Sequence, residues 1–153
     1  MTPAITRRLL AALLLFGAVS AVGGGILGVA FGGAGVPLEY LEGTPFTSFV
    51  WPGLILGVVI GGTQSVAAIA VLRRHPLAMA AASVAGFGMI LWIFAELAIL
   101  AEYSPLQTVY VALGIIELLL VLRLAGVFTL TPRPRPAAPH GGVQHTEPER
   151  STS

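Results

Sequence analysis

The stretch from Phe49 to Arg74 constrains the fold of this chain more than any other feature. Its sequence is FVWPGLILGVVIGGTQSVAAIAVLRR, and apolar residues fill most of its length. It lacks the alternation of apolar and polar residues that a transmembrane β-strand needs. About 20 consecutive apolar residues are enough for a helix to cross a bilayer. The stretch therefore predicts a membrane-spanning helix that begins at Phe49, has Pro52 in its first turn and ends before a pair of arginines.

The composition of the whole chain points to the same solvent. Of its 153 residues, 56% are hydrophobic and 10% are charged, whereas soluble domains carry about 25% charged residues. A soluble domain this short leaves much of its surface in water, so we expect a lipid bilayer as its environment. The absence of cysteine excludes disulfides, thiolate metal sites and cysteine nucleophiles. No basic surface points to nucleic acid as a partner.

Three further apolar stretches have the length of a membrane span. We therefore expect an all-α fold, a transmembrane four-helix antiparallel bundle, within residues 1–128. The predicted helices lie at about residues 9–31, 49–72, 77–101 and 106–128.

The two ends of the chain need separate interpretation. Residues 129–153 are rich in proline, charge and small polar side chains, which cannot bury a core, and they predict a disordered cytoplasmic tail. Near the other end, Arg7 and Arg8 precede an apolar run, as in a cleavable signal peptide. The run continues to Phe31, which favours an uncleaved helix.

The charges predict an orientation. Four spans place both termini on one side of the membrane, and every arginine falls on that side. The opposite loops carry Glu39, Glu42 and Glu102 and no basic residue. By the positive-inside rule, both termini lie in the cytoplasm of a multi-pass inner (plasma) membrane protein. The arginines are Arg7, Arg8, Arg73, Arg74, Arg123, Arg133, Arg135 and Arg150.

Two rows of glycines predict how the first two helices pack. In lipid, close approach of backbones through small residues supplies the packing between helices. Residues four apart share a helix face, and both rows fall in the outer half of the bilayer. Packing of the two helices within one chain is the interpretation we favour, and a homo-oligomer or another membrane protein as partner is the alternative. The rows are Gly24, Gly28 and Gly32 in the first helix, and Gly53, Gly57 and Gly61 in the second.

Three polar positions inside the predicted spans matter most. At about 1.5 Å per residue, Glu117 lies about 16 Å into its helix and Gln64 about 21 Å from the outer face. Their depths nearly match, so a hydrogen bond between them is geometrically feasible. Glu96 lies about 8 Å below the outer boundary by the same rise, where it can reach outer water or a lipid headgroup.

Ionisable groups inside a membrane are costly and suggest a function by default. Burial favours the neutral form of a carboxyl group, so Glu117 is a candidate for a reversible proton or cation site, with Gln64 and Thr63 as partners. The alternative is a structural hydrogen bond that holds two helices together, which we favour because no basic residue lies at that depth. We find no catalytic constellation, no metal site and no cofactor motif.

Two local patterns carry a family resemblance. They are Pro45-Phe-Thr-Ser-Phe-Val-Trp-Pro-Gly53 and Gln107-Thr-Val-Tyr-Val-Ala-Leu-Gly-Ile-Ile-Glu117. Over roughly residues 9–128, the chain resembles a group of small, uncharacterised bacterial four-helix membrane proteins that are DoxX-like in size and layout. The resemblance implies no catalytic residue. It draws attention to Gln107 and Tyr110, which share one face of the last helix with Glu117.

Three functions are compatible with these features. The first is a non-enzymatic accessory or interaction component of the cell envelope, which we favour. The second is a small transporter or channel subunit that uses Glu117. The third is a lipid- or quinone-linked membrane enzyme, which needs more polar groups than the spans contain.

Overall fold

The computed structural model describes residues 2–33, 35–100 and 103–127, and this part of the chain is helical with no strand. The all-α prediction is confirmed. The predicted tail at 129–153 lies outside the described residues. The elements are α1 (Pro3–Ala30), the 3-10 turn η1 (Leu38–Leu41), α2 (Val50–Leu54), the π-helical segment η2 (Ile55–Ile60), α3 (Gly61–Leu72), α4 (Ala78–Leu100) and α5 (Pro105–Leu124).

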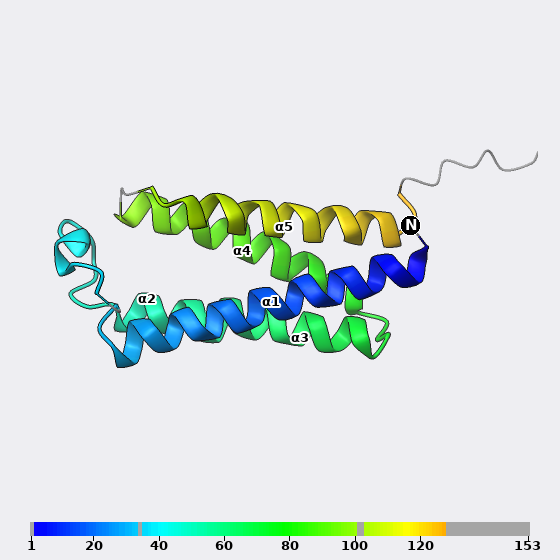
Figure 1. Cartoon of the computed structure of the whole chain (residues 1–153), viewed down its shortest axis with the longest axis horizontal. Helices are drawn as coiled ribbons and strands as arrows, with labels where there is room; N and C mark the ends of the chain where they lie inside the picture. The colour runs from blue at the N-terminus through cyan, green and yellow to red at the C-terminus, as the bar shows by residue number, and fades with distance from the viewer. Residues whose placement is uncertain (1, 34, 101–102, 128–153) are drawn as a thin grey trace, which may run out of the picture.

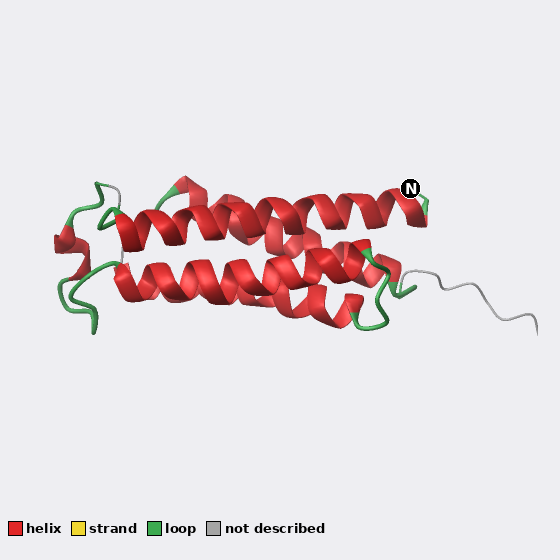
Figure 2. Ribbon diagram, turned by 90° about the horizontal axis from the view of Figure 1, so that it is seen from below, coloured by secondary structure: helices red, strands yellow, loops and turns green. Residues whose placement is uncertain are grey.

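These elements form four rods, because α2, η2 and α3 continue one another over Val50–Leu72. Each rod is long and apolar enough to cross a membrane. In Figure 1, α5 lies above α1 and the α2–α3 rod, and α4 slants from beside α5 to behind α1. The start of α1 lies at the same end as the end of α5. Contacts link α1 to α3, α3 to α4, α4 to α5, and α5 back to α1. The rods therefore close into a four-helix bundle, which Figure 2 shows along its side.

Capping residues explain where the helices begin and end. The α1 helix begins at Pro3 rather than near residue 9, because the Thr2 hydroxyl accepts a hydrogen bond from the Ile5 N–H and proline suits the first helical turn. The α5 helix ends at Leu124 rather than at residue 128. Gly126 takes a positive φ of 78° and forms a Schellman cap, in which Val127 N donates to Leu122 O at 3.1 Å.

The two ends of the bundle differ in packing. We call the end that carries Arg7, Arg8, Arg73, Arg74 and Arg123 the arginine end. The opposite end, which carries residues 35–49 and the turn residues Tyr103 and Ser104, is the loop end. The larger buried cluster lies toward the arginine end and draws residues from α1, α3, α4 and α5. Toward the loop end the buried cluster contains only Ala21, Ile60, Met89 and Leu113. The core is therefore dense at one end and sparse at the other.

The outer surface of the rods is apolar. Val19 of α1, Val58 of η2 and Leu91 of α4 are 73%, 68% and 71% exposed, respectively. A soluble bundle would place polar residues at such positions. An apolar exterior around a bundle of this length matches the interior of a bilayer.

Candidate functional site

A seam of backbone contacts between α1 and the α2–η2 segment sets the geometry of the loop-end half. A Cβ placed on Gly25 would lie 2.6 Å from Gly57 Cα and 2.7 Å from the Gly53 carbonyl oxygen. One placed on Gly28 would lie 3.0 Å from Gly53 Cα. The two helices touch here without intervening side chains, which is the packing expected of small residues in lipid.

Five of the six glycines predicted to pack lie between the first two rods, and Gly32 does not. Gly53, Gly57 and Gly61 all face α1. In α1, Gly28 lies in the seam, but Gly24 faces the Leu56 side chain.

Gly32 makes no packing contact with the part of the chain that the structure describes. It follows the end of α1 with a φ of +59°, and no atom of a neighbouring element lies within 4 Å of a Cβ placed on it. Its role is to let the chain leave the helix. The seam of α1 instead follows Ala18, Ala21, Gly25 and Gly28, whose alternating three- and four-residue steps fit the 3.6-residue turn better than a strict step of four.

The π-helical segment η2 keeps the glycine row of the second rod aligned. In η2 the Gly61 N–H donates to the carbonyl oxygen of Leu56, five residues earlier. A four-residue step exceeds the α-helical turn, so such a row drifts around a regular α-helix. The wider π turn offsets this drift, and Gly53, Gly57 and Gly61 all stay against α1.

Gln64 and Glu117 form a buried polar pair where the two halves of the bundle meet. Gln64 Nε2 on α3 donates to Glu117 Oε2 on α5 at 3.1 Å, and to the Ala85 carbonyl oxygen on α4 at 3.5 Å. Both side chains are 0% exposed. Gly17 of α1 makes room for the amide, because a Cβ there would lie 3.0 Å from Gln64 Cδ. The hydrogen bond between Gln64 and Glu117, which their similar depths suggested, is therefore present. Residues of all four rods surround it.

Each member of this pair keeps one oxygen without a partner in the described part of the chain. These oxygens are Gln64 Oε1 and Glu117 Oε1, and both are buried. An ionised carboxylate can only accept hydrogen bonds, and so can an amide oxygen. A proton on Glu117 would supply a donor to the pair. Thr63, predicted as a further partner, instead donates to the Ile60 carbonyl oxygen at 2.9 Å.

The face of α5 predicted to point inward does so. Gln107, Gly114 and Glu117 are buried, and Tyr110 is half-buried. Gln107 closes a capping box, because its Oε1 accepts from the Ser104 N–H at 2.9 Å. The Tyr110 ring stacks on Phe16 of α1, with 6.5 Å between their centroids. Gln107 and Tyr110 therefore both make structural contacts toward the loop end.

Gly114 adds a second seam that the glycine rows did not reveal. A Cβ on Gly114 would lie 2.9 Å from the Gly86 carbonyl oxygen, so α4 and α5 also meet backbone to backbone. Gly86 and Gly114 lie 28 residues apart in sequence, counted from their numbers. Only the fold shows that they face each other.

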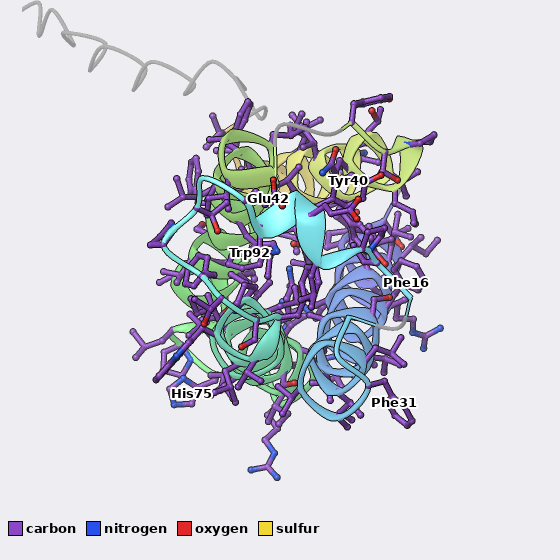
Figure 3. The ribbon with its side chains drawn as sticks, turned by 90° about the vertical axis from the view of Figure 1, so that its left-hand side faces the viewer. Phe16, Phe31, Tyr40, Glu42, His75 and Trp92 are labelled. Carbon is purple, nitrogen blue, oxygen red and sulfur yellow. The ribbon has the colours of Figure 1, made fainter. Side chains whose placement is uncertain are left out.

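Two adjoining cavities occupy the loop end, one of about 450 Å³ and one of about 780 Å³. Trp92 and Glu96 of α4 line both of them, while Tyr40 of η1 lines the smaller one. Figure 3 looks onto this end, where η1 crosses the bundle near Tyr40 and Trp92. Glu96 is half-buried, and it meets the cavities rather than the polar pair. Neither Gln64 nor Glu117 lines either cavity.

Comparisons add no further assignment to this geometry. Family models, curated proteins and solved structures yielded no match to the chain. Among the described residues, no group of three or more histidine and carboxylate side chains is placed to hold a metal ion.

Proposed function

We propose that this chain is a multi-pass integral protein of the inner (plasma) membrane that acts as a non-enzymatic accessory or interaction component of the cell envelope. The observation that carries the proposal is the sealed Gln64–Glu117 pair. Its hydrogen bond joins α3 to α5, and neither residue lines either cavity. A side chain that carries a proton or ion across a membrane needs access to water on each side, and this pair is enclosed by four helices.

The pair instead fits a structural role. Hydrogen bonds between membrane helices contribute about 0.6 kcal/mol on average, and up to about 2 kcal/mol. Such a bond fixes which faces of α3 and α5 meet. The apolar exterior then contacts lipid, a second copy of the chain or another membrane protein.

A flux experiment separates this proposal from the transporter alternative. The chain and its Glu117→Gln variant are reconstituted into liposomes loaded with a pH-sensitive dye, and a pH gradient or a potential is applied. The amide of glutamine fills the same space and still accepts a hydrogen bond from Gln64. We expect both proteins to assemble equally and both liposome samples to leak protons no faster than protein-free liposomes.

The opposite result would have a clear form. A proton or cation flux that the native chain supports and Glu117→Gln abolishes, with assembly unchanged, would contradict the accessory role and establish transport. The Glu42→Gln variant is the matched control, because Glu42 is exposed at the loop end.

We also propose that both termini and the arginine end face the cytoplasm. The support is the charge distribution, because the described arginines gather at one end while Glu39 and Glu42 lie at the other. The chain contains no cysteine, so single cysteines report sidedness directly. Glu42→Cys should react with a membrane-impermeant maleimide in intact cells, and His75→Cys only after permeabilisation. The reverse pattern would invert the topology.

A further inference from the structure

Glu96 is a carboxylate without a counter-charge where the two loop-end cavities meet. It lines both cavities. No hydrogen bond or ion pair joins it to another residue in ranges 2–33, 35–100 and 103–127. The described arginines lie at the opposite end of the bundle, and none of them lines a cavity. An isolated acidic group within a membrane span is a site where a cation is favoured.

Four aromatic residues share the wall of the smaller cavity with this carboxylate. Trp92, Tyr40, Tyr103 and Tyr110 line the smaller cavity together with Glu96. They come from α4, η1, the α4–α5 turn and α5, so the fold gathers them from four parts of the chain. Aromatic faces attract organic cations, and cages of such rings recognise quaternary ammonium groups.

Two of these rings are held in place by contacts outside the cavity. The Tyr103 hydroxyl lies 2.7 Å from Thr108 Oγ1, and Tyr110 stacks on Phe16. A wall held by such contacts needs little ordering when a ligand enters, which favours binding.

The larger cavity supplies an apolar extension. It shares Trp92 and Glu96 with the smaller one, and its remaining walls include Leu27, Val59 and Leu91. A ligand that fills both spaces therefore has a positive group beside Glu96 and an apolar body. A phosphate or sulfate has no basic side chain to meet in either cavity.

We infer that the loop end binds a lipophilic organic cation, with the positive group of the ligand paired to Glu96 and surrounded by Trp92 and the three tyrosines. The ammonium group can belong to a free amphiphilic amine or to the headgroup of a membrane lipid. This site goes beyond the accessory role and does not involve the Gln64–Glu117 pair.

Binding of radiolabelled tetraphenylphosphonium to the purified full chain in dodecyl maltoside tests the inference. The detergent is a neutral amphiphile in large excess, so saturable binding reports the charge of the probe. We expect binding that Glu96→Gln weakens at least tenfold and that Trp92→Leu also weakens. Glu42→Gln is the control, because it removes one negative charge at the same end outside the cavities and should bind like the native chain.

Tryptophan fluorescence gives a second measurement on the same protein. The chain has two tryptophans, and Trp51 is 64% exposed. In a Trp51→Phe variant the emission comes from Trp92 alone and should change with probe concentration along the same curve. Circular dichroism of Glu96→Gln checks that the helices are intact.

The outcomes decide the matter in each direction. No saturable binding by the native chain, or equal binding by Glu96→Gln and the native chain, overturns the inference. If dodecyltrimethylammonium alone displaces the probe, the ligand is a free amphiphilic cation. If lysophosphatidylethanolamine displaces it equally well, a lipid headgroup is the source. The flux experiment with Glu117→Gln has its own result, so either conclusion can fail without the other.

Discussion

Gly25→Ala should separate α1 from the α2–η2 segment. The added Cβ would lie 2.6 Å from Gly57 Cα, 2.7 Å from Gly53 O and 2.8 Å from Gly57 N. Ordinary contact begins at 3.4 Å, so the helices must open by 3.4 − 2.6 = 0.8 Å at this point. All three neighbours are backbone atoms of a helix, and no side-chain rotation relieves the clash.

The magnitude follows from two terms. Inserting a carbon into a packed core costs about 1–3 kcal/mol, and an opening of this size forfeits about a quarter to a half of each dispersion contact along the seam. Alanine also stabilises a helix by up to about 1 kcal/mol relative to glycine, which partly offsets the packing cost. Gly23→Ala isolates this gain, because Gly23 lies on the same helix with nothing within 4 Å of its Cβ position. We expect Gly25→Ala to be less stable than Gly23→Ala by about 1–3 kcal/mol.

Reversible unfolding in mixed micelles of dodecyl maltoside and sodium dodecyl sulfate, followed by circular dichroism, measures this difference. Gly57→Ala provides a graded comparison. A Cβ on Gly57 would lie 3.3 Å from Gly25 Cα, which a small shift accommodates, so this variant should fall between the other two. If Gly25→Ala unfolds no earlier than Gly23→Ala, the seam does not have the spacing described and the reasoning fails.

Two further predictions concern the polar pair and a helix end. Glu117→Leu should destabilise the bundle by about 1–3 kcal/mol, because the buried Gln64 amide loses the shorter of its two hydrogen bonds and keeps only the one to Ala85 O at 3.5 Å. The double variant Gln64→Met with Glu117→Leu should recover much of that loss. Strictly additive effects of the two changes in the same unfolding assay would show that the bond is not formed. Arg74 follows the end of α3 with a φ of 54°, a left-handed conformation that costs a non-glycine residue roughly 1–2 kcal/mol. Glycine adopts this conformation without strain, but it loses more backbone entropy when the chain folds. Arg74→Gly should therefore raise the free energy of unfolding by a net amount of about 0.5–1 kcal/mol. Arg73→Gly removes the same charge at a φ of −80° and should not stabilise the chain; equal unfolding midpoints for the two glycine variants would argue against the strained cap.

The predictability of the site from sequence depended on whether a feature repeats along one helix. The row Gly53, Gly57 and Gly61 was visible because residues four apart share a face. The packing role of Gly25 was not visible, because the α1 residues of the seam follow alternating three- and four-residue steps. Gly114 was missed as a packing residue, because it depends on Gly86 of another helix.

The polar residues show the same division. Depth along two spans was enough to suggest the bond from Gln64 to Glu117, and the structure has it at 3.1 Å. Depth did not indicate that Gly17 makes room for the amide, or that Gln107 caps its own helix. It also placed Glu96 near the outer boundary without indicating the cavities that this residue lines.

The sequence by itself predicted a lipid environment, the number of helices long and apolar enough to cross a bilayer, and the end at which the arginines gather. These follow from the length and polarity of continuous segments, because a bilayer demands about 20 apolar residues per crossing and penalises charge within it. Only the tertiary structure decided that α1 closes over Gln64. It also decided that the larger buried cluster lies toward the arginine end, and that four aromatic residues line a loop-end cavity together with Glu96. In lipid, burying leucine does not drive helices together, so the rotation of each helix is set by close backbone contacts and single hydrogen bonds between distant residues. Such contacts leave no continuous pattern along the chain.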